Sequence, residues 1–192
     1  QTHNKVMASV FQSVSARTAG FATIAYVDAH QSTLFIWIGL MMIGGASAST
    51  AGGVKLATFA VVVLAIVSTL RGQSEPQVAG KRIPTPLVFR ALTIIALYMV
   101  THFALTLTLV LTEDKIGDND FAFLPLMFET MSGLATVGVS TGITPDLSDA
   151  GKLVLCLTMF IGRLGPLTAV YALQRRESPQ AYSFPEAYIR MG

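Results

Sequence analysis

Two short segments of the sequence carry residues suited to binding a cation that has shed its water shell. One lies inside the stretch FETMSGLATVGVSTGITP at residues 128–145 and consists of Thr136, Val137, Gly138 and Val139. A selectivity filter replaces the hydration shell of an ion with backbone carbonyls, so it needs backbone that is neither helix nor strand. Glycines such as Gly138 and Gly142 adopt the positive φ angles that turn successive carbonyls inward. This stretch therefore predicts a cation filter.

A second copy lies near the start of the chain, in FQSVSARTAGFATIAYVD at residues 11–28. Its filter residues, 118 positions before those of the first copy, are Thr18, Ala19, Gly20 and Phe21. The same spacing gives eight identities, which also include Thr23 with Thr141, Asp28 with Asp146, Met41 with Met159, Ile43 with Ile161, Gly44 with Gly162 and Thr50 with Thr168. Membrane transporters are often built from internal repeats that converge on one ion site. The sequence therefore predicts two pore units.

The composition indicates an all-α integral membrane protein. Of the 192 residues, 52% are hydrophobic and 12% are charged, against about 25% charged in an average soluble domain. The mean hydropathy is +0.59. A net charge of +2 gives no indication of nucleic-acid binding, and one cysteine excludes an internal disulfide. Because Cys156 lies in an apolar run, we expect it to be a small buried hydrophobe.

The element before the first filter is predicted to be a re-entrant pore helix. Residues 4–16 are too short to cross a bilayer, which takes about 20 apolar residues. Arg17 follows directly, where a cation would repel the transported ion. We expect Arg17 to point away from the pore and to pair behind the filter, with Asp28 or with a carboxylate elsewhere.

Residues 33–70 are one long apolar stretch that is interrupted in the middle. A straight helix of that length would span about 57 Å, far more than the roughly 30 Å of hydrocarbon. The interruption consists of Gly44, Gly45, Ala46, Ser47, Ala48, Ser49, Thr50, Ala51, Gly52 and Gly53. Irregular backbone at membrane depth occurs where it is buried in protein or lines a wet cavity, so we expect a gate below the filter. The alternative is a small-residue patch for close helix packing. Lys55 is expected at the cavity or at the cytoplasmic end.

Charge places the next segments on opposite sides of the membrane. Residues 71–90, with three prolines and two glycines, are predicted to be a loop, and their net charge of +3 places them in the cytoplasm. Residues 91–112 form a full membrane span. Its His102 could relay protons, but we favour a packed, hydrogen-bonded histidine. Residues 113–120 carry a net charge of −3, so the segment 113–122 is predicted to be extracytoplasmic. That segment is either an acidic vestibule that concentrates cations or a merely solvated loop.

The last predicted span, residues 152–174, contains a charge near the middle of the bilayer. Placing Arg163 there costs at least about 2.5–3.5 kcal/mol, so it needs a partner or a watery cavity. Below the filter, its cation would limit ion occupancy or donate hydrogen bonds to the carbonyls of the interrupted loop. The alternative is simple snorkelling. Pro166, with Gly162 and Gly165, is expected to kink this helix.

A competing interpretation starts from Ser140. Residues 138–142 fit G-x-S-x-G, the nucleophile elbow of serine hydrolases, and His102 would then be the base. That motif needs a strand before the serine and a helix after it, whereas here a helix precedes and a loop follows. A purely structural membrane subunit is a third possibility, but it leaves the two filter copies unexplained. Replacing Ser140 with Ala would inactivate a hydrolase and would leave a pore largely unaffected.

The motifs together resemble the Trk/Ktr/HKT superfamily of potassium transporters, namely the C-terminal half of a bacterial Ktr/Trk-type membrane subunit. They are SARTAGF at 15–21, GGASASTAGGVK at 44–55, SGLATVGVSTGITP at 132–145, GRLGPLT at 162–168 and YSFPEAYIRMG at 182–192. The resemblance implies four helix–pore-loop–helix repeats around one potassium pathway. Residues 1–70 would hold part of the third repeat, 71–90 the linker, 91–181 the fourth repeat and 182–192 the C-terminal tail.

The same resemblance implies how the protein works and what it binds. Gly20 and Gly138 fall on filter glycines, residues 44–53 on the gating loop and Arg163 on an arginine facing the cavity. The transported ion would be K⁺, held by backbone carbonyls, with Na⁺ or H⁺ as a coupling ion and no covalent cofactor. The expected setting is the inner membrane, with the C-terminus cytoplasmic. Expected partners are the lipid bilayer, the missing N-terminal half, a second copy of the subunit and a cytoplasmic nucleotide-binding ring. We expect no enzymatic activity.

Overall fold

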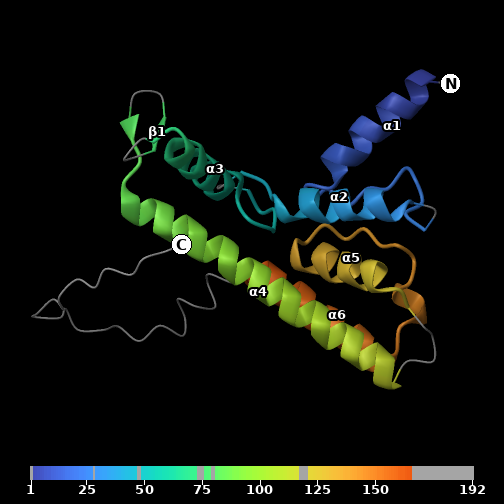
Figure 1. Ribbon diagram of the computed structural model, residues 1–192. Coiled ribbons are helices and arrows are strands. Elements are labelled where there is room, and N and C mark those ends of the chain that lie inside the picture. Colours follow the sequence, from blue (N-terminus) through green and yellow to red (C-terminus); the bar gives the residue numbers. More distant parts are fainter. Residues whose placement is uncertain are drawn as a thin grey trace, which may run out of the picture.

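The computed structural model describes residues 2–27, 29–46, 49–72, 76–78, 81–116 and 121–165, and most of them are helical. The α-helices of this part of the chain are α1 (Thr2–Ser15), α2 (Gln31–Met42), α3 (Leu56–Leu70), α4 (Thr85–Ile116), α5 (Phe123–Leu134) and α6 (Asp149–Leu164) (Figure 1). A short 3₁₀ helix, Thr144–Asp146, precedes α6. Strands β1 (Gln77–Val78) and β2 (Lys81–Arg82) form an antiparallel hairpin.

The segment between α3 and α4 differs from the predicted loop of residues 71–90. It contains the hairpin, so the chain is not purely helical, and α4 begins at Thr85, not at residue 91. Prolines marked this segment as a loop in the sequence. A proline in the first turn of a helix is tolerated, however, because the N–H that it lacks would have no partner there. Pro86 occupies this first turn.

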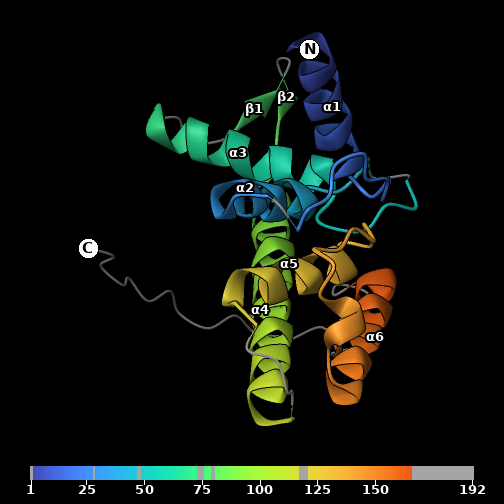
Figure 2. The same cartoon turned by 90° about the vertical axis from the view of Figure 1, so that its right-hand side faces the viewer.

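Helix α4 is the longest element, and three other helices pack along it. α3 contacts its N-terminal half, while α5 and α6 lie along its C-terminal half, and α2 packs on α5 (Figures 1 and 2). By length and composition, α4 is the one helix among the described residues that could cross a membrane, over Thr85–Asp114. Its 30 residues extend about 45 Å, which exceeds the roughly 30 Å hydrocarbon thickness of a bilayer.

Four threonine side chains of α4 are compatible with apolar surroundings. Thr93, Thr101, Thr108 and Thr112 each donate a hydroxyl hydrogen bond to the carbonyl four residues earlier, over 2.7–2.9 Å. This back-bonding satisfies each hydroxyl within the helix, so it needs no water. Large apolar side chains such as Val100 and Phe103 are exposed on the same helix, at 66% and 68%. α4 thus presents an outer surface suited to lipid.

The main hydrophobic core lies where the two predicted pore units meet. Tyr26, from the segment after α1, packs edge-on against Trp37 of α2, with ring centroids 5.1 Å apart. The same ring lies 5.4 Å from that of Phe128 on α5. All three side chains are buried, and Met131 and Leu134 of α5 belong to the same cluster. Packing at this junction positions α2 and α5 and the segments that follow them.

Cys156 of α6 corrects one expectation. It is exposed, as are its neighbours Leu153, Leu157 and Phe160. The prediction of a buried cysteine was wrong because an apolar run does not distinguish burial in protein from an apolar surface that faces lipid or another part of the subunit.

Candidate functional site

The two predicted filter segments share an unusual backbone. In the first Thr-x-Gly segment, residues 18–21, φ is 65° at Thr18 and 76° at Gly20. In the second Thr-x-Gly segment, residues 136–139, φ is 55° at Thr136 and 84° at Gly138. These two threonines are the only non-glycine residues with positive φ in the described part of the chain. A β-branched residue is strained in this conformation, and such strain is concentrated at functional sites.

The two segments also meet in space. A Cβ placed on Gly20 would overlap the carbonyl oxygen of Val137, so the first segment approaches the backbone of the second in a way that only glycine permits. Val137 is buried, whereas Gly138 is exposed and has open space around its Cα. The backbones of two segments 118 residues apart therefore border one another.

A buried carboxylate on α5 supports the second Thr-x-Gly segment from behind. Glu129 is 5% exposed, and its Oε1 accepts hydrogen bonds from Thr141 N at 2.7 Å and Thr141 Oγ1 at 2.9 Å. Ser140 Oγ also donates to Oε1, at 2.7 Å, and Thr144 Oγ1 donates to Oε2 at 2.9 Å. Four donors thus fix the chain directly after the segment.

An amide on α1 supports the first Thr-x-Gly segment in the same way. Gln12 is 3% exposed, and its Oε1 accepts from Thr23 N at 3.2 Å and from Thr23 Oγ1 at 3.1 Å. Thr23 is the repeat counterpart of Thr141, so both units anchor the same threonine to a side chain of the preceding helix.

A serine on each helix fixes the far end of each segment. Ser132 Oγ donates to the carbonyl oxygen of Val139 at 2.5 Å. Ser15 Oγ donates in the same way to the carbonyl oxygen of Phe21. The last carbonyl of each segment is thereby held close to its supporting helix, α5 or α1.

The Gly-rich loop, residues 44–53, lies between α2 and α3 and is folded back on itself. Gly44 N donates to Val54 O at 2.8 Å, and Val54 N donates to Met42 O at 2.9 Å. A Cβ on Gly44 would overlap the carbonyl oxygen of Gly52, so the two arms of the loop approach one another too closely for any other residue. The described parts of the loop, residues 44–46 and 49–53, are thus held together at the base by backbone hydrogen bonds.

The loop also contacts the second Thr-x-Gly segment. Gly52 N donates to Thr136 Oγ1 at 3.0 Å. A Cβ on Gly52 would lie 2.5 Å from both Ala135 O and Thr136 Oγ1, so glycine is needed for this contact. The strained threonine of the segment is therefore also the anchor of the loop.

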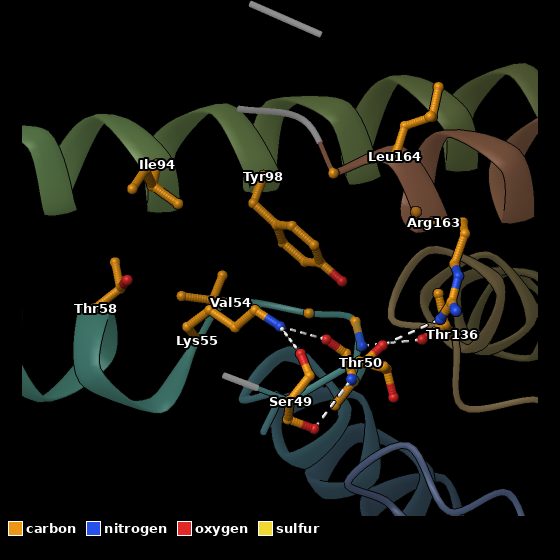
Figure 3. A pocket seen from close by; sticks show the side chains of 15 residues that line it. Ser49, Thr50, Val54, Lys55, Thr58, Ile94, Tyr98, Thr136, Arg163 and Leu164 are labelled. Atoms are coloured by element: carbon orange, nitrogen blue, oxygen red, sulfur yellow. Dashed lines mark hydrogen bonds between the residues drawn. The ribbon is translucent and has the colours of Figure 1, made fainter. Parts of the chain in front are cut away.

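Two cations also hold the loop, in a cavity of about 420 Å³ that Thr136 lines as well. Arg163 Nη1 donates to Thr50 O at 3.1 Å, and Lys55 Nζ donates to Ser49 O at 3.0 Å and Ala51 O at 2.6 Å. Figure 3 shows both side chains extending to the loop, with the phenol of Tyr98 pointing into the same space from α4. Arg163 lies next to Gly162, where a Cβ would overlap Leu134 O, so α6 packs closely on the end of α5.

Several predicted features lie outside the described residues: Asp28, Ser47, Ala48, Pro166, the end of the last span and the tail at 182–192. Arg17 is exposed, but its expected partner Asp28 is among these residues, so that pairing stays a prediction. α6 ends at Leu164, followed by Gly165 with φ 77°. Whether the chain kinks at Pro166 also stays a prediction.

The residues of the hydrolase alternative do not meet. Ser140 Oγ is bonded to Glu129 and lies 3.1 Å from Thr144 Oγ1. His102 is packed, at 3% exposed, but neither ring nitrogen has a hydrogen-bond partner among the described residues. The expectation of a hydrogen-bonded histidine was therefore wrong in that respect. The hydroxyls one turn before and one turn after His102 on α4 belong to Tyr98 and Thr106. Both hydroxyls are bonded to α5 instead, to Met131 and Thr130.

The supporting side chains on α1 and α5 were missed from the sequence. The residues are Gln12, Ser15, Glu129 and Ser132. A signal existed, because Gln12 precedes Glu129, and Ser15 precedes Ser132, by 117 positions, one fewer than the filter spacing. The second unit has one extra residue between its helix and its Thr-x-Gly segment. A search at the spacing of 118 residues therefore pairs the two Thr-x-Gly segments but places the residues of α1 one position out of register with those of α5.

Comparison with known proteins identifies the family of the chain. The family model described as "TrkH: Cation transport protein" matches residues 1–185. The chain is 38% identical to Ktr system potassium uptake protein B of Bacillus subtilis over 98% of its length, covering 41% of that protein. It is 39% identical to the protein of the same name from Vibrio alginolyticus, over 100% of the chain and 40% of the relative. These relatives are named as uptake proteins, not as enzymes.

The fold is similar to a solved structure as well. The crystal structure of the potassium transporter TrkH from Vibrio parahaemolyticus matches with a TM-score of 0.67 and 22% identity. The match covers 83% of this chain and 35% of that one, and the chain spans about two fifths of the length of the curated relatives above. Because the family model covers nearly the whole sequence, the resemblance drawn from the motifs is confirmed. The chain belongs to the TrkH family of membrane cation transport proteins.

Proposed function

We propose that this chain is part of the pore-forming subunit of a potassium transporter, and that its two Thr-x-Gly segments form two sides of the selectivity filter. The observation that carries the proposal is the repeated left-handed backbone at Thr18 and Gly20 and at Thr136 and Gly138. A carbonyl-lined filter needs backbone of this irregular kind, and two copies that border one another provide two walls of one pathway. K⁺ is the proposed cargo because the relatives are named as potassium uptake proteins.

The helices receive roles from this proposal. α1 and α5 are re-entrant pore helices, each ending directly before a Thr-x-Gly segment. α2 and α3 are the two parts of one interrupted membrane helix, and the rest of the subunit supplies the other two sides of the filter. Each pore helix aims the negative end of its dipole at the ion, which favours a cation.

The Gly-rich loop is proposed to be the gate. It contacts the second Thr-x-Gly segment through Thr136, while Arg163 and Lys55 hold its carbonyls. Cations at this place neutralise carbonyl oxygens that would otherwise attract the transported ion. The closed position of the loop is held by these few hydrogen bonds. Opening of the gate requires them to break.

The assembly around this pathway follows from the family and from charge. We propose an inner-membrane subunit with residues 71–90 and the C-terminus in the cytoplasm and residues 113–122 outside. A second copy and a cytoplasmic nucleotide-binding ring are the proposed partners. Na⁺ or H⁺ is the proposed coupling ion.

The function is tested by K⁺ and Na⁺ flux in proteoliposomes that contain the intact subunit. Gly138→Ala should reduce selectivity for K⁺, because alanine disfavours a φ of 84° in a segment that must keep its carbonyls aligned. Gly72→Ala is the matched control, since Gly72 also has positive φ and open space but lies after α3. Loss of selectivity in both variants, or in neither, would contradict the proposal.

The gate is tested by shortening the Gly-rich loop. Deleting Thr50 and Ala51 removes two of the three carbonyls that Arg163 and Lys55 hold and leaves that of Ser49, so the flux should rise. An unchanged flux through a well-folded variant would show that the loop does not gate the pathway.

A further inference from the structure

We propose that the carboxylate of Glu129 sets the cation affinity of the pathway, as a fixed negative charge behind the second Thr-x-Gly segment that has no counterpart among the residues that the structure describes behind the first. This inference rests on the proposed transport function and extends it to a residue outside the filter itself. Glu129 would act through the segment without touching the ion, so it is a positioning and affinity-determining residue.

The first support is the way in which Glu129 is bonded. Its four hydrogen bonds all come from hydroxyl or backbone N–H donors, and Thr141 N can only donate. Accepting from every neighbour is the role of an ionised carboxylate. The charge is buried directly behind Ser140 and Thr141, which follow Gly138 and Val139 without a break.

The second support is the neutral counterpart in the other unit. Gln12 holds Thr23 through the same two donors, a backbone N–H and a hydroxyl, that Thr141 offers to Glu129. The serine donor is absent, because Ala22 corresponds to Ser140, and a tyrosine, Tyr26, stands at the position of Thr144. Gln12 Nε2 and Tyr26 Oη have no partner among the described residues. An uncharged amide is therefore sufficient to anchor the segment, so anchoring alone does not explain a charge at position 129.

The third support is a cavity of about 490 Å³ that joins the carboxylate to the filter. Glu129, Gly138, Ser140 and Arg163 all line it. Arg163 Nη1 donates to Thr50 O, so its hydrogen bond is directed to the Gly-rich loop. The carboxylate of Glu129 and the second Thr-x-Gly segment therefore line the same cavity.

The expected size of the effect follows from electrostatics. A unit charge about 10 Å from an ion, at an effective dielectric constant of about 20, changes its binding constant on the order of tenfold. A buried charge is also screened little by salt. Glu129→Gln should therefore raise the KM for K⁺ on the order of tenfold while the maximal rate changes little, because the amide keeps the bonds to Thr141.

The experiment measures K⁺ and Rb⁺ uptake by the intact subunit in proteoliposomes, with a thermal melt of each variant. Besides Glu129→Gln, it includes Gln12→Glu and the double swap. Gln12→Glu should lower the KM, and the double swap should bring it back toward the wild-type value, because the charge is moved to the opposite side of one pathway. A merely structural glutamate would lower the melting temperature without changing KM.

The outcomes separate the two proposals. A wild-type subunit without K⁺ flux would overturn the transport function and this inference with it. Normal wild-type flux with an unchanged KM in Glu129→Gln would overturn the inference alone. If Glu129→Gln fails to fold, an unchanged KM in Gln12→Glu overturns it equally.

Discussion

At the scale of single residues, Thr136 combines two tasks that are usually separate. It is the first residue of the second Thr-x-Gly segment and has a φ of 55°. Its hydroxyl oxygen accepts a hydrogen bond from the N–H of Gly52. Thr18 has the same backbone conformation in the first segment. The Gly-rich loop and the second Thr-x-Gly segment, the proposed gate and filter, are therefore joined at Thr136, so we expect a change of the loop to be transmitted to the segment.

Removing this hydroxyl should loosen the gate. Thr136→Val keeps the shape of the side chain but leaves Gly52 N without its acceptor, which costs about 1–3 kcal/mol in the closed loop. We expect a higher resting K⁺ flux from Thr136→Val in proteoliposomes. Thr136→Ser retains the hydroxyl and is the control, so equal fluxes in the two variants would argue against this link.

At the scale of elements, close approach of backbone decides the arrangement. Gly52 lies against the end of α5, and Gly151 of α6 lies against Glu113 of α4, where a Cβ would overlap the carboxylate. Small residues allow helices and loops to pack without a hydrophobic driving force in lipid. The positions of α5, α6 and the Gly-rich loop thus depend on a few glycines.

A methyl group at one of these contacts should displace the loop. Gly52→Ala would place Cβ 2.5 Å from Ala135 O, so the loop must move away from the second segment. If the loop blocks the pathway, flux should increase. Gly39→Ala on α2 is the control, because its Cβ would meet nothing within 4 Å. A flux increase in both variants would point to general loosening and not to the gate.

The contact between α4 and α6 should determine stability more than transport. Glu113 is 3% exposed and accepts from Ser148 Oγ at 2.7 Å and Ser148 N at 3.3 Å, at the start of α6. A carboxylate there also favours the positive end of the helix dipole. Glu113→Ala should cost about 1–3 kcal/mol and lower the melting temperature, whereas Asp114→Ala, at an exposed neighbour, should not. Equal melting temperatures would contradict the role of this contact.

At the scale of the whole molecule, the sequence predicts what depends on periodicity and repeats, and misses what depends on packing. The apolar runs predicted the long apolar helix α4, and the 118-residue spacing paired the segments at Gly20 and Gly138. The hydrogen bonds of Glu129 could not be read in this way, because the one-residue difference in spacing hides its relation to Gln12. The burial of single residues could not be predicted from the sequence either: Cys156 lies in an apolar run but is exposed.

The orientation in the membrane can be tested with the same chain. In a Cys156→Ser background, Lys81→Cys in β2 should react with an impermeant maleimide from the cytoplasmic side, because it lies in the basic segment. Asp114→Cys, at the far end of α4, should react from the outside. Both positions are exposed, so access is decided by the side of the membrane. Labelling of both from one side would exclude α4 as a membrane span.

The most direct test of the central claim is to locate the ion. Crystals or frozen grids of the intact subunit in Rb⁺ or Tl⁺, compared with matched samples in Na⁺, would show where a heavier potassium analogue binds. We predict density between residues 18–20 and 136–138, within coordination distance of backbone carbonyls from both Thr-x-Gly segments. Density that contacts neither segment, in a subunit that transports K⁺, would contradict the account.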